Sequence, residues 1–222
     1  MGRGRFGGCH EAQFSPILRP VDARVAVLAS GGGTNLQALL DDPVVGPALA
    51  LVISDRKEAK ALDRARSAGI RAVHLDPVAH PTRRAHDAEL ESLLASEGID
   101  IVCLAGYMRI LGPVVIRRHW GRVLNVHPSL LPAFPGAHAI EDALAWGVKL
   151  TGCTVHLVDE EVDHGPIVAQ EAVPVLDGDD PATLHARVQE VEHRLYPQAV
   201  RALGERRVQV EGRRVRLKET AR

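Results

Sequence analysis

An amide and an imidazole stand two positions apart in the segment LNVHPSLLPAFPGAH, residues 124–138. The apolar run RVLNV leads into Asn125, Val126 and His127, and a proline-rich loop follows. Because residues i and i+2 of a strand face the same side, we expect Asn125 and His127 to project together. A carboxamide that can donate to an oxyanion, beside an acid–base group titrating near neutral pH, suits acyl-type transfer. The structural alternative is a polar strand end at which His127 only caps a turn.

A glycine-rich loop, SGGGTNLQ at residues 30–37, separates an apolar run from a helical pattern. Its backbone N–H groups and the helix N-terminus predict an anion site, most simply for a phosphate. The loop is not a dinucleotide fingerprint, because Leu36 occupies the third glycine position, and no Gly-Lys-Ser/Thr follows for a P-loop. A flexible strand-to-helix turn is the alternative.

A second polar cluster, DEEVDHGP at residues 159–166, follows an apolar run. In a parallel sheet this loop and His127 would meet at the carboxyl edge, so Asp159 or Asp163 is a candidate partner for the imidazole. An ordinary solvated loop is the alternative on spacing alone.

The segment LAGYMRIL, residues 104–111, ends an apolar strand and surrounds Arg109 with Met108, Ile110 and Leu111. Apolar groups at a strand end can line a slot for a flat ligand, although core packing with one surface arginine would give the same pattern. The chain has 11 histidines, but none has the H-E-x-x-H or Cys/His finger spacing. We therefore expect no metal.

Strand-like and helix-like patterns alternate along the chain, which predicts an α/β fold. The expected architecture is a Rossmann-like, mostly parallel twisted sheet with helices on both faces and mixed strands toward the C-terminal half. Strands are expected at 25–30, 49–55, 70–76, 99–106, 152–159 and 166–175, helices at 35–42, 57–69, 82–98, 140–147 and 181–203, and a hairpin turning at Glu211-Gly212 within 206–219.

The composition is that of a globular domain rather than a nucleic-acid or membrane protein. The 222 residues carry a formal net charge of −1, and no apolar stretch reaches the roughly 20 residues that span a bilayer. The three cysteines form no CxxC and there is no signal core, so we expect a cytoplasmic protein. Residues 1–22, rich in Gly and Arg, are predicted to be a disordered extension.

Five ordered segments together resemble the phosphoribosylglycinamide formyltransferases, the folate-dependent formyltransferases of purine biosynthesis. The segments span roughly residues 24–203 and read VAVLASGGGTNLQAL, LAGYMRIL, NVHPSLLPAFPGAHAIEDAL, GCTVHLVDEEVDHGPIVAQ and ARVQEVEHRLYP. The resemblance implies a single formyltransferase domain over 23–205, with a phosphate-binding half at 23–105, a folate and catalytic half at 106–205, and a tail at 206–222. It implies formyl transfer from 10-formyltetrahydrofolate to the amino group of glycinamide ribonucleotide, without a metal.

Position by position, the resemblance makes Asn125, His127 and Asp163 the catalytic trio. It implies two binding regions: phosphate and glycinamide contacts from Gly33, Thr34, Asn35, Gln189 and Glu192, and folate contacts from Arg83, Met108, Arg109, Ile110, Leu111, Asp159, Glu160, Glu161 and Val162. His138 corresponds to a histidine near the active site. The chain departs from the pattern at Gly32, where many members have Asn, and at His164, where Gly or Thr is common.

Two other functions remain open at this point. A deformylase would hydrolyse 10-formyltetrahydrofolate without an amine acceptor, and a nucleotide-binding module would leave the trio idle. The expected partners are small-molecule substrates, with neither nucleic acid nor membrane, and a homodimer is an open alternative. Leu131-Pro132 is a candidate cis bond at the catalytic loop.

Overall fold

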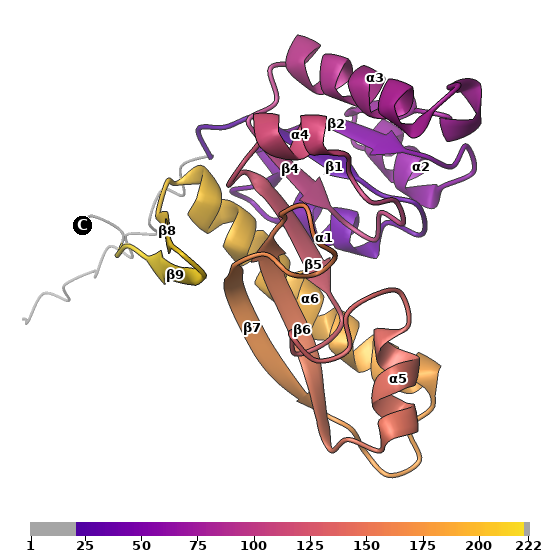
Figure 1. Ribbon diagram of the computed structural model, residues 1–222, viewed down its shortest axis with the longest axis vertical. Helices are drawn as coiled ribbons and strands as arrows, with labels where there is room; N and C mark the ends of the chain where they lie inside the picture. Colours follow the sequence, from indigo (N-terminus) through magenta and orange to yellow (C-terminus); the bar gives the residue numbers. More distant parts are fainter. Residues whose placement is uncertain (1–20, 220–222) are drawn as a thin grey trace, which may run out of the picture.

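A computed structural model describes residues 21–219 and centres on one seven-stranded sheet (Figure 1). The strand order is β3-β2-β1-β4-β5-β6-β7, and β8 and β9 form a separate hairpin. The strands are β1 (Val25–Leu28), β2 (Leu49–Ser54), β3 (Arg71–His74), β4 (Ile101–Leu104), β5 (Val123–His127), β6 (Leu150–Leu157), β7 (Ile167–Pro174), β8 (Val208–Glu211) and β9 (Arg214–Leu217).

Helices cover both faces of this sheet. The α-helices are α1 (Thr34–Asp41), α2 (Lys60–Ser67), α3 (Arg83–Ser96), α4 (Pro113–Arg118), α5 (Ala139–Trp146) and α6 (Pro181–Gly204), with two short 3₁₀ segments, η1 (Gly46–Ala48) and η2 (Pro77–Ala79). Side chains alternate along each strand, so Val25 and Val27 pack with α1, α2 and α6, whereas Ala26 and Leu28 pack with α3 and α4. The expected two-faced α/β architecture is confirmed.

The sheet is parallel through β5 and antiparallel beyond it. Strands β1 to β5 pair in parallel, β6 runs antiparallel to β5, and β7 runs antiparallel to β6. The mixed character predicted for the C-terminal half is therefore confirmed. Strand order reverses between β1 and β4, and in open α/β sheets ligands bind beyond the carboxyl ends at such a switch point.

The long helix α6 is tied to the sheet centre through Tyr196. Its hydroxyl is fully buried and lies 2.9 Å from the Leu104 carbonyl oxygen and 3.0 Å from that of Leu124. The helix begins with a capping box formed by Asp180 and Thr183. This anchoring fixes the side chains that α6 presents toward the glycine loop.

Most expected elements are present, with small differences at their ends. Helix α4 was not predicted, because it has only six residues and begins at Pro113 within an apolar segment. The hairpin turn lies at residues 212–213, one position later than expected. Val21 is buried against Gly204, so packing begins inside the range assigned to the N-terminal extension, whose residues 1–20 lie outside the described part. Among the described helices, none is long and apolar enough to span a bilayer.

Candidate active site

Asn125 and His127 meet the same carboxylate, that of Asp163. Asn125 Nδ2 donates to Asp163 Oδ1 over 3.3 Å, and His127 Nδ1 lies 3.5 Å from Asp163 Oδ2. The His127 side chain is 6% exposed and that of Asp163 11%. The i, i+2 relationship on β5 thus presents both groups to one face, as the sequence predicted.

Asp163 reaches this pair by a route that the sequence did not suggest. Because β6 is antiparallel to β5, the loop after β6 leaves the sheet beside Val123 rather than beside His127. We expected the acidic loop to begin at the same carboxyl edge of the sheet as the loop after His127, and this expectation is wrong. The loop instead folds back over the sheet, and Asp163 adopts a left-handed φ of 52° that a non-glycine residue rarely takes.

Close packing at Gly165 permits this return. A Cβ on Gly165 would lie 1.8 Å from the Leu157 carbonyl oxygen, so only glycine fits where the two arms of the loop meet. The Leu157 N–H donates to Pro166 O, which closes the base of the loop. The Gly-Pro that ends the acidic segment is therefore part of what positions Asp163.

The surroundings of Asp163 keep its carboxyl group ionised. Burial opposes the charge, but a hydrogen bond with His156, the N–H of Gly136 at 2.7 Å and the charge of His127 outweigh it. Together they hold the pKa of Asp163 below its usual value.

Both ring nitrogens of His127 face oxygen atoms. Its Nε2 donates to the Phe134 carbonyl oxygen over 2.8 Å, and its Nδ1 faces the Asp163 carboxylate. Each ring nitrogen can therefore donate to an oxygen when it carries a hydrogen. The Phe134 backbone adopts a φ of 51°, which directs its carbonyl into the site.

His156 is a fourth member of this cluster that sequence reasoning missed. It is buried, pairs with Asn125 across the β5–β6 ladder, and its Nε2 lies 3.1 Å from Asn125 Nδ2 and 3.6 Å from Asp163 Oδ1. Its Nδ1 donates to the Leu157 carbonyl oxygen over 2.9 Å. The local sequence of His156 is that of an ordinary strand residue. Only the antiparallel register of β5 and β6 would have shown that His156 lies beside Asn125.

Buried polar groups hold the proline-rich loop after β5. Leu131-Pro132 is a cis bond, as the sequence suggested it could be. The Thr154 hydroxyl donates to Ser129 O over 2.6 Å and accepts from Leu131 N, and the Gln170 amide donates to Leu131 O. Strands β6 and β7 thereby fix the loop that carries Phe134 and Gly136.

The glycine loop lies at the N-terminus of α1. Gly33 has a φ of +69°, and a Cβ there would lie 2.9 Å from Ala61 Cα, so α2 packs directly behind the loop. Arg64 of α2, which the sequence analysis did not single out, donates to Gly32 O over 2.9 Å. An exposed loop of backbone N–H groups beside a guanidinium suits a phosphate. The position of Arg64 could be found only from the packing of α2 on the loop.

Asn35 and Glu192 connect the glycine loop with α6. Asn35 Nδ2 donates to Glu192 Oε2 over 2.8 Å, and both residues are buried. Gln189 lies nearly one turn earlier on α6 and is half-buried. Asn35, Gln189 and Glu192, all assigned to the ribonucleotide, therefore belong to one region. Thr34, the first residue of α1, lies next to Asn35.

The residues assigned to folate differ in their exposure. Met108 and Ile110 are 59% and 57% exposed, and Val162 is 53% exposed, so apolar surface is available there. Leu111 instead is buried in the core under α3 and α4. Arg83 donates to the carbonyl oxygens of Ile110 and Leu111, which fixes the backbone of this segment.

The remaining predicted residues lie around this surface. Glu160 pairs with Arg117 of α4 at 2.9 Å, and Asp159 accepts from His164 at 2.8 Å. Ser30 hydrogen-bonds both Asp55 and the Met108 N–H, which joins the glycine loop to the apolar segment. His138 is exposed at the start of α5, and Arg109 and Glu161 are on the surface as well, Arg109 only in part.

Comparison with known proteins assigns the chain to a family. Residues 23–200 match the model of the formyl transferase family. The chain belongs to the formyl transferase family. A formyl transferase relative from Mycobacterium tuberculosis, phosphoribosylglycinamide formyltransferase, is 49% identical over 192 residues, covering 86% of this chain and 89% of the relative. The trifunctional purine biosynthetic protein adenosine-3 of Homo sapiens is 46% identical over 191 residues, covering 85% of this chain but 19% of that protein.

The fold agrees with that of a solved family member. Glycinamide ribonucleotide transformylase 1 from Symbiobacterium toebii superposes with a TM-score of 0.87 at 52% identity, covering 89% of this chain and 94% of that one. The resemblance inferred from the five sequence segments is therefore confirmed, and the chain is a formyltransferase.

Proposed function

We propose that this formyltransferase transfers the formyl group of 10-formyltetrahydrofolate to the amino group of glycinamide ribonucleotide, in purine biosynthesis. The observation that carries the proposal is the convergence of Asn125 and His127 on the Asp163 carboxylate. The similarity to relatives named for this reaction supports the choice of substrates.

In the proposed reaction the substrate amine attacks the formyl carbon and forms a tetrahedral intermediate. In the free protein Asn125 Nδ2 donates to Asp163 Oδ1. The formyl oxygen takes the place of this acceptor, so the amide donates to the oxyanion as it forms. A donor of this kind typically contributes about 100- to 1,000-fold in rate.

His127 and Asp163 supply charge and proton transfer. The His127 imidazolium, held between Asp163 and the Phe134 carbonyl, adds positive charge beside the oxyanion. Asp163 accepts the proton that the attacking nitrogen loses and passes it toward the folate nitrogen, which leaves when its bond to the formyl carbon breaks. The formyl group moves directly from nitrogen to nitrogen, without a covalent enzyme intermediate.

The two substrates bind on either side of this trio. The N–H groups of Gly33, Thr34 and Asn35, with Arg64 beside them, hold the ribonucleotide phosphate, and Gln189 and Glu192 contact its glycinamide end. The folate lies against the exposed Met108 and Ile110 and the loop that carries Asp163. Fixing both reactants in this way can contribute several kcal/mol.

A coupled assay tests the proposal. Spectroscopic release of the folate product should depend on added glycinamide ribonucleotide, and formate should not accumulate. Formate release without an acceptor would instead identify a deformylase. Ribonucleotide binding by calorimetry without any transfer would identify a binding module. The homodimer and the cytoplasmic location stay predictions.

A further inference from the structure

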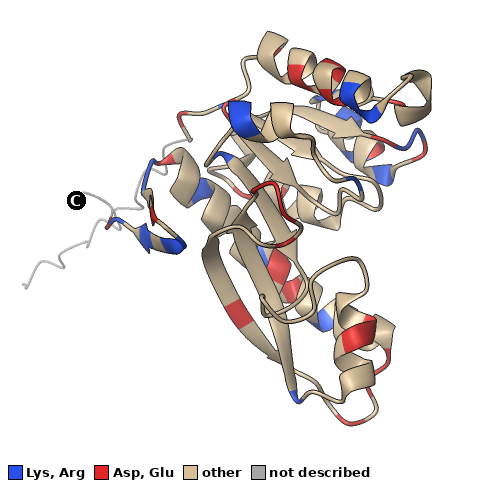
Figure 2. Ribbon diagram, in the orientation of Figure 1, with Lys and Arg blue, Asp and Glu red and all other residues tan. Residues whose placement is uncertain are grey.

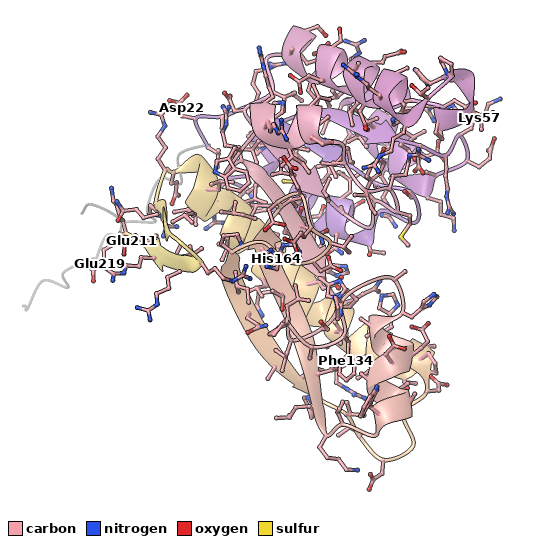
Figure 3. The ribbon with its side chains drawn as sticks, viewed as in Figure 1. Asp22, Lys57, Phe134, His164, Glu211 and Glu219 are labelled. Atoms are coloured by element: carbon pink, nitrogen blue, oxygen red, sulfur yellow. The ribbon has the colours of Figure 1, made fainter. Side chains whose placement is uncertain are left out.

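The tip of the C-terminal hairpin contacts the loop that carries Asp163. Arg213, in the turn between β8 and β9, donates to the His164 carbonyl oxygen over 2.5 Å. Its other terminal nitrogen lies 3.0 Å from His164 Nε2. Figure 3 labels His164 over the sheet, between the hairpin at Glu211 and the loop at Phe134. This contact connects a segment outside the family match of 23–200 with the active-site loop.

The hydrogen bonds at His164 form a continuous chain. Asp159 Oδ2 lies 2.8 Å from His164 Nδ1, so this nitrogen donates to the carboxylate. In the tautomer with its hydrogen on Nδ1, the Nε2 lone pair can accept from Arg213. Arg213 therefore holds both the backbone and the side chain of His164, one residue after Asp163.

The charge of the loop gives this contact an electrostatic reason. Asp159, Glu160, Glu161 and Asp163 place four carboxylates within five positions. Figure 2 shows this loop in red, with blue positions on α4 and on the hairpin to either side. Arg117 of α4 pairs with Glu160, and Arg213 approaches Asp159 through His164. Two cations from two different elements thus offset the repulsion within the loop.

The backbone of Asp163 needs such external restraint. A left-handed φ of 52° in a non-glycine residue persists only where its surroundings enforce it. The Gly136 N–H binds the Asp163 carboxylate, and Gly165 and Pro166 close the base of the loop. The backbone of His164, the residue directly after Asp163, is held by the bond from Arg213 to the His164 carbonyl oxygen.

We propose that Arg213 is a positioning residue, which holds the 159–164 loop through His164 so that Asp163 stays beside His127. The consequence for activity rests on the proposed formyl transfer, whereas the restraint of the loop does not. Because the glycine loop and α1 lie elsewhere on the sheet, the role of Arg213 concerns the folate side and leaves ribonucleotide binding unaffected.

Amide hydrogen exchange and steady-state kinetics test this on Arg213→Ala, Arg213→Lys and, as a matched control, Arg214→Ala. Arg214 is the adjacent exposed arginine, with no side-chain hydrogen bond or ion pair to the described residues. We expect Arg213→Ala to speed exchange at 159–164 and to lower kcat/KM for the formyl donor by about 3- to 10-fold, the range of a hydrogen bond to a charged group at a partly exposed site. KM for the ribonucleotide should not change.

Rescue and coupling separate this role from a general loss of stability. Arg213→Lys should restore part of the effect, because an ammonium group can still donate to His164 O. In the double variant with His164→Ala, the fold-changes should be less than multiplicative, since the ring contact is already lost. Exchange rates and kcat/KM values for Arg213→Ala equal to those for Arg214→Ala would overturn the proposal, as would a loss of activity with a lower Tm but unchanged exchange at 159–164. The exchange result decides the restraint even if no formyl transfer is found.

Discussion

Asn35 and Glu192 form a buried hydrogen bond of 2.8 Å across 157 positions of sequence. The bond joins the first turn of α1, which follows the glycine loop, to the middle of α6, the helix assigned to the glycinamide group. Asn35 Oδ1 is buried and has no partner among the described residues.

Removing this bond should weaken both folding and ribonucleotide binding. Asn35→Ala leaves the Glu192 carboxylate buried without its donor, which we expect to cost about 1–3 kcal/mol in the free energy of unfolding. Urea denaturation measures this cost, and KM for glycinamide ribonucleotide should rise roughly tenfold. Glu192→Gln keeps an acceptor for Asn35 and should be the milder change in stability. Equal stability of wild type and Asn35→Ala would contradict this account.

Two threonines on β6 provide a matched pair for the proline-rich loop. Thr154→Val removes a hydroxyl that bonds Ser129 O and Leu131 N, so we expect a loss of about 1–3 kcal/mol and reduced turnover. The Thr151 hydroxyl is equally buried and has no partner within residues 21–219. Thr151→Val should therefore be neutral or stabilising in the same urea titration. The reverse order of the two variants would show that this network does not support the loop.

The ionisation of Asp163 predicts an acid limit. Burial alone would raise its pKa, and the bonds from His156 and Gly136 N, with the charge of His127, lower it below the 3.8 of a free carboxyl. A depressed folded-state pKa stabilises the fold above the unfolded-state value, and this contribution is lost as pH falls through the folded-state pKa. Carbon-13 NMR of the Asp163 carboxyl should show this low pKa in wild type and a higher one in His156→Ala. An unchanged titration in His156→Ala would exclude His156 from this role.

The sequence predicted the parts of the fold that depend on local pattern. The alternation of apolar runs and helical spacing gave the parallel strands and their covering helices, and the i, i+2 rule placed Asn125 and His127 on one face. The sequence also predicted mixed strands toward the C-terminal half, but it did not show which strand reverses direction. The antiparallel β6 sends the acidic loop to the opposite end of β5, and only the tertiary fold shows that the loop returns with Asp163.

The residues that were missed share one property, which is that long-range packing gives them their position. His156 faces Asn125 through strand register, Arg64 reaches Gly32 through the packing of α2, and Arg213 reaches His164 from the hairpin. Leu111 illustrates the converse, because an apolar residue in a candidate slot turned out to lie in the core. Local sequence cannot separate these cases, since the same residue types suit a surface, a core or a site.

The most direct test of the central claim is the single-turnover rate of formyl transfer to glycinamide ribonucleotide, in wild type and in Asn125→Ala, His127→Ala and Asp163→Ala. If the Asn125 amide stabilises the oxyanion, its loss should slow the reaction about 100- to 1,000-fold while the protein still folds. His127→Ala and Asp163→Ala should likewise lose most turnover. Transfer by folded His127→Ala at a rate near that of wild type would contradict the account.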